Sequence, residues 1–263
     1  MQKIEAMTNN NIVLLGRRDR PTAILYNSLC ADGLAPVAVI VEEPESRWNF
    51  LRRRIRREGL MKVIGQVAFR ATVVPWLKIT SRKRIKSLMA EAGLEDAAIP
   101  EKALRKVASV NSGECIAALI ELKPAVVVVS GTRIISKRVL QETPATFINM
   151  HTGITPKYRG SHGGYWALVQ GDREACGVTV HAIDAGIDTG PIFEQCTVRL
   201  NGKDNFVTYS LVQQAVGLPL LRKAIRDVQK VEAKPLKPAG DSKLWTHPTL
   251  TEYIRNRVRL GVK

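Results

Sequence analysis

The sequence predicts an α/β fold with a mostly parallel sheet, and its first fifty residues already carry that prediction. Asn11–Gly16 is a short apolar run closed by glycine, and Val37–Val41 is an apolar, β-branched run. Between them, Pro21–Asp32 has the composition of a helix with proline in its first turn. A strand, a helix and a second strand in this order indicate a parallel β-α-β unit.

Later segments extend the predicted sheet. Pro124–Ser130 is a continuous apolar run, which is typical of a strand buried on both faces. Asn111 and Ser112 precede it and have the side chains that cap a helix start. Two further strands are expected at Gly177–Ile183 and Ile192–Val198, on either side of a loop that contains glycines.

The chain that follows the second strand is strongly basic. Between Arg47 and Lys86, thirteen Lys or Arg stand against Glu58 alone, so this segment carries +12 of the formal net charge of +16. Pro75 is expected to separate two helical pieces here. We interpret residues 44–90 as a basic helical insertion. Its role stays open between a solvated face, a surface for a phosphorylated acceptor or RNA, and a surface for an anionic membrane.

Composition places the chain among globular proteins of a reducing compartment. The apolar fraction of 45% and the charged fraction of 24% are ordinary for a globular domain. The four cysteines lack C-x-x-C spacing, which argues against a zinc site or a disulfide framework and favours a cytoplasmic location. Met1–Asn11 is polar and lacks the apolar core of a signal peptide. No apolar run is expected to span a membrane.

The C-terminal part differs in pattern from the part that contains the strands. Asp204–Val228 is predicted to be a helix, Glu232–Gly240 a linker rich in proline, and Pro248–Arg259 a final basic helix that starts at Thr246 or His247. The chain is therefore divided into a main domain of residues 10–200 and a short helical appendage of residues 201–263.

Reactive side chains gather near the middle of the chain. Asn149 and His151 are two positions apart on extended chain, so their side chains point the same way. Thr179 and His181 share one face of the strand expected there, by the same argument. The loop after this strand carries Asp188. An amide, two imidazoles and a carboxylate are thus expected around one site.

This set of groups suits the attack of an amine on an activated acyl group. His151 can polarise a carbonyl or move a proton, and Asn149 offers N–H donors to a developing oxyanion. Asp188 can raise the basicity of His151 or hold a water that relays a proton. Each residue alone has a structural explanation, but the ordered set favours catalysis. His162 lies outside the set and is expected in a loop or at a substrate rim.

The order N-x-H, P-x-Y-R-G and G-V-T-V-H-x-I-D-x-G-I-D-T-G resembles the core of the 10-formyltetrahydrofolate-dependent formyltransferases. That family includes glycinamide ribonucleotide, methionyl-tRNA and amino-sugar N-formyltransferases. The resemblance implies a Rossmann-like sheet, a catalytic domain over residues 10–200, and catalytic roles for Asn149, His151 and Asp188. Where relatives usually read H-P-S-L-L-P, this chain reads H-T-G-I-T-P, so the loop after the histidine differs.

The resemblance also implies a formyl donor and its pocket. The donor would be 10-formyltetrahydrofolate, and no metal would be required. Thr179 and His181 would lie on the substrate side. The residues that match the family's pterin pocket are Arg133, Ile134, Ile135, Ile183, Asp184 and Asp188.

The resemblance leaves the amine acceptor open. The loop after the first strand is basic but is not a G-S-G-S-N-type phosphate loop, which counts against glycinamide ribonucleotide. Its side chains could still bind phosphate. The tail is too short for the tRNA-binding barrel of methionyl-tRNA formyltransferases. The favoured acceptor is a small-molecule amine, on a nucleotide-linked or otherwise phosphorylated sugar.

Several alternatives to this function and to its partners stay open. The functional alternatives are formylation of glycinamide ribonucleotide or methionyl-tRNA, hydrolysis of the donor, and a non-enzymatic basic binding module on the same core. The partners kept as expectations are an anionic membrane surface, bound through residues 47–86, and a second copy of the chain in a homodimer. Nucleic acid is disfavoured.

Overall fold

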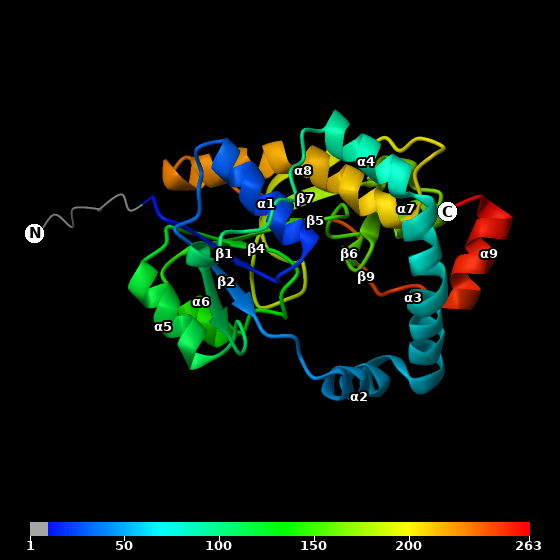
Figure 1. Ribbon diagram of the computed structural model, residues 1–263, viewed down its shortest axis with the longest axis horizontal. Helices are drawn as coiled ribbons and strands as arrows, with labels where there is room; N and C mark the ends of the chain where they lie inside the picture. The colour runs from blue at the N-terminus through cyan, green and yellow to red at the C-terminus, as the bar shows by residue number, and fades with distance from the viewer. Residues whose placement is uncertain (1–9) are drawn as a thin grey trace, which may run out of the picture.

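The structure is a computed structural model that describes residues 10–263. Seven strands of these residues form one sheet (Figure 1). Residues 1–9, most of the polar N-terminal segment, lie outside the described part. In spatial order the strands are β3 (Leu104–Val107), β2 (Ala38–Glu42), β1 (Ile12–Gly16), β4 (Val126–Val129), β5 (Thr146–His151), β7 (Gly177–Ala182) and β8 (Ile192–Thr197). The first five are parallel, and β7 and β8 are antiparallel to their neighbours. This confirms the predicted α/β fold with a mostly parallel sheet.

Helices cover both faces of this sheet. Along the chain they are α1 (Arg20–Ala31), α2 (Arg47–Glu58), α3 (Leu60–Thr80), α4 (Arg82–Glu91), α5 (Gly113–Leu122), α6 (Lys137–Glu142), α7 (Gly163–Val169), α8 (Phe206–Gln229) and α9 (Leu250–Leu260). Residues of α1, α4 and α8 pack on one face of the sheet, and residues of α5 and α6 pack on the other.

The alternation of side chains along β1 shows how the two cores form. Leu14 packs into the core under α1 and α8, whereas Val13 and Leu15 pack into the core under α5. All three side chains are fully buried. A central parallel strand is covered on both faces, which is why its sequence is continuously apolar rather than alternating.

The basic segment folds as three helices, of which α2 and α3 extend away from the sheet (Figure 1). We call these two helices the arm. The breaks between helices fall at Gly59 and Ser81, and Pro75 lies inside α3. The expectation that Pro75 separates two helical pieces is therefore wrong. The chain turns between α2 and α3 at Gly59 instead, where the φ of 86° lies in a region that favours glycine.

Helix α3 also corrects the expectation about membrane-spanning length. Within residues 10–263 it is long and apolar enough to cross a membrane, judged by length and composition alone. Its side chains at Val63, Gln66, Phe69 and Leu77 are nevertheless buried against the rest of the protein.

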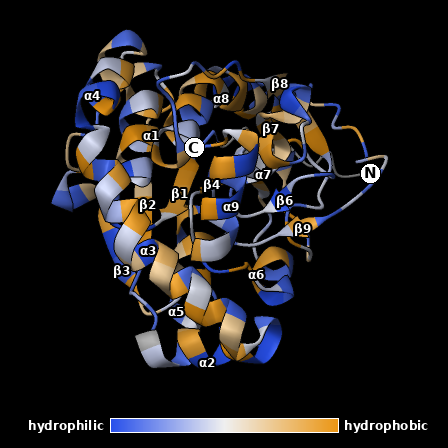
Figure 2. Ribbon diagram, turned by 90° about the vertical axis from the view of Figure 1, so that its right-hand side faces the viewer, coloured by the Kyte–Doolittle hydropathy of each residue, from blue (hydrophilic) through white to orange (hydrophobic). Residues whose placement is uncertain are grey.

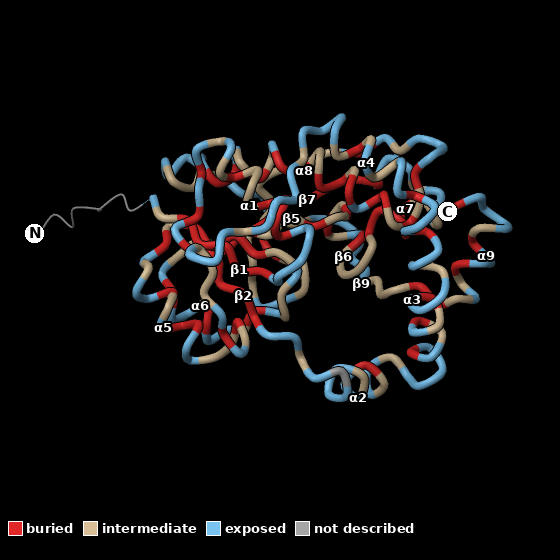
Figure 3. The backbone as a smooth tube through the Cα atoms, in the orientation of Figure 1, coloured by how far each residue is buried: buried red, intermediate tan, exposed pale blue. Residues whose placement is uncertain are grey.

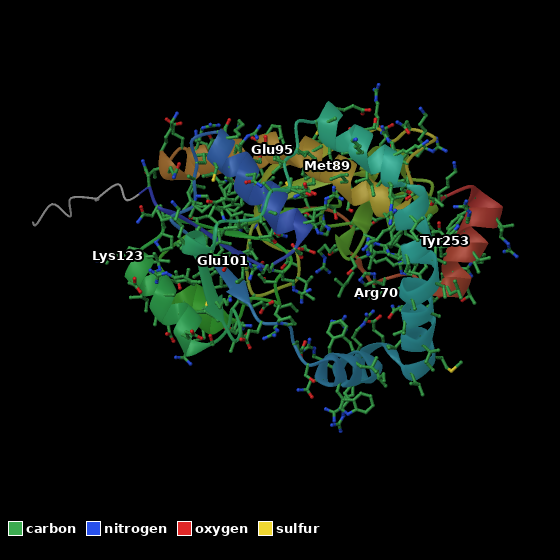
Figure 4. All side chains as sticks on the ribbon, in the orientation of Figure 1. Arg70, Met89, Glu95, Glu101, Lys123 and Tyr253 are labelled. Carbon is green, nitrogen blue, oxygen red and sulfur yellow. The ribbon has the colours of Figure 1, made fainter. Side chains whose placement is uncertain are left out.

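A third core, rich in aromatic residues, joins the arm to the C-terminal helix. Phe69 of α3 lies between Phe206 and Tyr253, with ring centroids 4.9 and 5.0 Å away. Figure 4 labels Tyr253, which lies on α9 next to α3. The predicted C-terminal helix is present, but its cap is Thr249, which forms a capping box with Glu252, rather than residue 246 or 247.

Removing the ring of Phe69 tests whether this aromatic core stabilises the whole protein. We expect Phe69→Ala to lower the free energy of unfolding by about 3–5 kcal/mol, because a fully buried ring leaves a cavity. The matched control is Ile64→Ala on the exposed side of the same helix, with an expected change of about 0.5 kcal/mol or less. Urea unfolding followed by circular dichroism measures both. Equal midpoints for the two variants would show that the arm does not contribute to global stability.

Candidate active site

Strand β5 places Asn149 and His151 on one face of the sheet, where both line a cavity of about 390 Å³. β5 pairs with the antiparallel strand β7, and the register sets Asn149 opposite His181. Side chains opposite each other on neighbouring strands lie within contact distance. The Asn149 Nδ2 is accordingly 3.2 Å from the His181 Nε2.

Asp188 reaches the same cavity through a loop that folds back. Because β7 is antiparallel to β5, it ends at the edge of the sheet opposite to the carboxyl ends of the parallel strands. Directly after β7, the Ile183 N–H donates to the carbonyl of Phe147, near the start of β5, at 2.8 Å. The following loop is held by Asp184, whose Oδ1 accepts from the Gly186 N–H at 2.9 Å and from the Thr189 hydroxyl at 2.6 Å. This turn returns the chain toward β5.

The carboxylate of Asp188 contacts every reactive group of the cavity. Its Oδ1 lies 3.4 Å from the Asn149 Nδ2 and 3.5 Å from the His181 Nε2. Its Oδ2 lies 3.4 Å from the His151 Nδ1 and accepts the Gly160 N–H at 2.8 Å. Asp188 itself has a φ of 51°, which is rare for a non-glycine residue and occurs mainly where the surroundings hold it.

These contacts keep Asp188 ionised. Burial alone would raise the pKa of its carboxyl group. The charge of His151, the His181 contact and the Gly160 N–H outweigh burial and hold that pKa well below its usual range. The site therefore carries a fixed negative charge beside two imidazoles.

The hydrogen-bond network assigns the ring nitrogens of both histidines. The His151 Nε2 lies 2.7 Å from the carbonyl of Tyr158, so it carries a hydrogen and donates. This leaves the His151 Nδ1 facing Asp188. In His181 the Nδ1 donates to the carbonyl of Ala182 at 2.8 Å, and the Nε2 faces both the Asn149 Nδ2 and the Asp188 carboxylate. The Asn149 Nδ2 is directed toward His181 and Asp188.

Thr179 does not lie on the substrate side, contrary to the expectation. Its side chain is fully buried, and it is not among the residues that line the cavity. Its hydroxyl donates to the carbonyl of Gly153 at 2.8 Å and accepts the Thr155 N–H at 3.1 Å. Thr179 therefore holds the loop after His151, whereas its neighbour on the same face, His181, does line the cavity.

The residues expected in the pterin pocket lie around this cavity. The loop after β4 contributes Arg133, Ile134 and Ile135, and the loop after β7 contributes Ile183 and Asp184. Their environments differ. Ile134 is exposed and available for contact, while Ile135 is buried in the core under α5.

Arg133 is held by the end of β2 rather than extended into the cavity. Its backbone N–H donates to the Glu42 Oε1 at 2.8 Å, and its Nη2 donates to the carbonyl of Glu43 at 2.8 Å. The loop after β4 is thereby tied to the neighbouring strands. A ligand would meet the backbone of this loop and the exposed side chain of Ile134.

A second cavity, of about 670 Å³, lies between the arm and this site and shares part of its wall. The shared residues include Arg133, Gly160 and Asp188. The far wall is basic and comes from the end of β1 and from the arm; its arginines are Arg17, Arg53, Arg54, Arg57 and Arg70. We call this space the arginine cavity.

Two of these arginines are available to a ligand. Within residues 10–263, neither the Arg17 nor the Arg70 guanidinium has an ion-pair or hydrogen-bond partner. Figure 4 shows Arg70 on the side of α3 that faces the sheet. In contrast, Arg53 forms two hydrogen bonds with Glu45, of 2.8 and 2.7 Å, and Arg54 pairs with Glu58.

The C-terminal segment supplies part of the arginine cavity that sequence reasoning missed. A short strand, β9 (Leu244–Trp245), pairs with β6 (Arg159–Gly160) and brings His247 to the cavity wall. The His247 Nδ1 lies 2.9 Å from the Nε2 of His162, which is the cap residue of α7 and so occupies the loop position expected for it. No local pattern indicates this pairing, because it joins residues 85 positions apart.

Residues 62–216 match the family described as Formyl transferase, which is more than half of the chain. The chain belongs to the formyl transferase family. Among curated relatives, the chain is 34% identical over 145 residues to the methionyl-tRNA formyltransferase of Kosmotoga olearia, covering 55% of this chain and 46% of that protein. It is 37% identical over 115 residues to that of Thermodesulfovibrio yellowstonii, covering 44% and 37%. The matches thus span less than half the length of these relatives.

Solved structures of formyltransferases share the fold of this chain. A sugar N-formyltransferase from Shewanella sp. superposes with a TM-score of 0.56 at 15% identity, covering 89% of this chain and 76% of that one. Glycinamide ribonucleotide transformylase 1 from Symbiobacterium toebii superposes with a TM-score of 0.56 at 17% identity, covering 87% and 96%. At these identities the likeness concerns the fold alone.

Stability should depend on pH through the contact between His162 and His247. Burial, together with the charges of Arg70 and Arg54, lowers the pKa of His247 to about 4, and burial lowers that of His162 as well. The unfolded chain therefore takes up these protons first as the pH falls below about 6.5. The stability contribution is complete above that pH and is lost toward pH 4.

We expect His247 to account for a loss of about 2 kcal/mol in the free energy of unfolding between about pH 7.5 and pH 5. His247→Gln should flatten this part of the profile, because glutamine does not titrate. Urea unfolding of both proteins across the pH range measures the slopes. Identical slopes would mean that His247 is not buried as the structure has it.

Proposed function

We propose that this protein transfers a formyl group from 10-formyltetrahydrofolate to a primary amine, with Asn149, His151 and Asp188 as the catalytic residues. The observation that carries the proposal is that an amide and two imidazoles each lie within 3.5 Å of one ionised carboxylate, that of Asp188, in one cavity. Family membership supports the reaction class.

The chemistry follows from what these groups can donate and accept. The amine nitrogen attacks the formyl carbon, a C–N bond forms, and the carbonyl oxygen becomes an oxyanion. The Asn149 amide and a protonated His151 donate hydrogen bonds to that oxyanion. The long contacts of 3.2 and 3.4 Å that the Asn149 Nδ2 makes are weak enough to be exchanged for a formyl oxygen.

Asp188 has two roles in this reaction, one toward the positive charge of His151 and one toward the proton that leaves the attacking amine. Its carboxylate stabilises the imidazolium form of His151 from 3.4 Å. It also holds a water that takes the proton lost by the attacking amine and passes a proton to the departing nitrogen of the folate. The bond between that nitrogen and the formyl carbon breaks, and tetrahydrofolate and the formamide are the products.

We place the donor against the loops after β4 and β7, and the acceptor on the side of the arginine cavity. The support for this placement is that the two cavities meet at Asp188 and Gly160. The guanidinium groups of Arg17 and Arg70 in the arginine cavity, unpaired within residues 10–263, favour an acceptor with phosphate groups, because guanidinium groups bind phosphate through paired hydrogen bonds. A phosphorylated or nucleotide-linked amino sugar fits this chemistry.

Removing the imidazole tests the catalytic assignment. His151→Ala should lower kcat by about 10²–10⁴-fold, because it removes both a proton donor and an oxyanion contact. Release of tetrahydrofolate in the presence of a panel of amines measures turnover, and a no-amine control detects hydrolysis of the donor. Calorimetric binding of a folate analogue to the variant should be unchanged, which confirms that it is folded. Near-normal turnover in a variant that binds the analogue would contradict the assignment.

Removing single arginines tests the acceptor side. Arg70→Gln or Arg17→Gln should weaken binding of inorganic pyrophosphate by about 10–100-fold, since a hydrogen bond to a charged group contributes about 1.5–3 kcal/mol. The matched control is Arg52→Gln, which lies on the same arm but does not line the arginine cavity. Titration calorimetry at low salt measures the affinities. If Arg52→Gln weakens binding as much as the other two, the arm acts only through its overall charge.

A further inference from the structure

Helix α3 is apolar on two opposite sides, and only one of them is covered by protein. Its inner side packs against α8 and α9. On the other side lies a stripe of large apolar side chains at helical spacing that the described part of the chain leaves exposed: Leu60, Met61, Ile64, Val67 and Ile79. We call this stripe the outer face of α3. The exposed fraction of Met61 reaches 80%.

This outer face differs from single exposed apolar residues because Leu60, Met61, Ile64 and Val67 follow one another at helical spacing, with Ile79 farther along the same helix. Single exposed leucines or valines are normal on protein surfaces, whereas long apolar patches mark interaction sites. In Figure 2 the side of the molecule that carries α9 faces the viewer, with α3 beside α9 and α2 below them. Figure 3 shows much of α2 and α3 in the pale blue of exposed residues, interrupted along α3 by red buried positions.

The charges around the outer face have one sign. Within Arg47–Lys86 the single acidic residue is Glu58, whose side chain is 5% exposed and pairs with Arg54. The exposed charges of this segment are therefore cationic. Its exposed cations include Arg52, Arg56 and Lys62.

Exposed tryptophans accompany these cations. Trp48 on α2 is 68% exposed, and Trp76 on α3 is 52% exposed. Tryptophan, lysine and arginine around an apolar stripe are the composition of helices that lie in a membrane interface.

We propose that the outer face of α3 docks on an anionic bilayer, with α3 lying along the surface rather than crossing it. Crossing would require lipid around the whole helix, but its inner side is held by protein. The side chain of Gln66 is fully buried and donates to the carbonyl of His247 at 2.8 Å. At about 1.5 Å per residue, α3 provides a contact roughly 30 Å long.

The charge and the apolar character of this surface favour an anionic bilayer over two other candidate partners, a second copy of the chain and RNA. A second copy of the chain would bring the same cations face to face, which is unfavourable. RNA would satisfy the cations but would leave the aliphatic stripe exposed to water. An anionic bilayer satisfies both, since its head groups attract the cations and its acyl boundary accepts the apolar side chains. The proposal does not depend on the acceptor argued above, because no substrate takes part in it.

The test is co-sedimentation of the full chain with vesicles made of equal parts phosphatidylglycerol and phosphatidylcholine, compared with pure phosphatidylcholine vesicles. We expect binding to the anionic vesicles and about tenfold weaker binding, or more, to the neutral ones. The triple variant Met61→Gln, Ile64→Gln, Val67→Gln should lose about tenfold or more in affinity for the anionic vesicles. A blue shift of tryptophan fluorescence on vesicle addition should be lost with it.

The matched control changes three exposed apolar residues elsewhere, Ile120→Gln, Val231→Gln and Leu236→Gln, and should bind like the parent protein. Thermal unfolding of both variants checks that they are folded. Equal sedimentation of the parent protein and the Met61 triple variant would overturn the proposal, as would absence of binding to anionic vesicles at low salt. A dimer in analytical ultracentrifugation that the triple variant dissociates, without vesicle binding, would assign the outer face to a second copy instead.

Discussion

The buried carboxylate of Asp188 is the interaction on which the candidate site depends. It receives contacts from β5, from β7 and from the β6 turn, which are separate in sequence. An ionised carboxylate in this position would be costly without these donors. The same contacts that keep Asp188 charged also hold Asn149, His151 and His181 in register, so charge and geometry are fixed together.

The arm depends on a second buried network of the same kind. Gln66 of α3 connects Glu58 of α2 with the C-terminal segment: its Nε2 donates to the Glu58 Oε2 at 2.9 Å and to the carbonyl of His247 at 2.8 Å, while its Oε1 accepts from Arg54 at 2.5 Å. The inner side of α3 is thus specified by polar contacts as well as by aromatic packing. This network fixes the position of the arginine cavity relative to Asp188.

Sequence patterns predicted the elements whose formation is local. The buried strands β1, β2 and β4 were evident from apolar runs, and α5 from its Ser112 cap. The strand β3 was not located, because at the sheet's edge it reads Leu-Arg-Lys-Val and lacks such a run. Residues of the site on β5 and β7 were predicted because strand periodicity fixes which side chains share a face. The hydroxyl of Thr179 was misplaced because periodicity does not say whether a loop covers that face.

The residues that match the family include the groups proposed for catalysis but few of those proposed to bind the acceptor. The loops around Asn149 and Asp188 all lie within the matched residues 62–216. Most of the arginine cavity's own wall lies outside that range: Arg17, Arg53 and Arg57 precede it, and Trp245 and His247 follow it. The groups proposed for the formyl donor and for catalysis therefore lie within the range that matches the family, whereas the arginine cavity's own wall lies mostly outside it, with Arg70 as an exception. One reaction class can serve different acceptors when the contacts to the acceptor come from outside the part that carries the reaction.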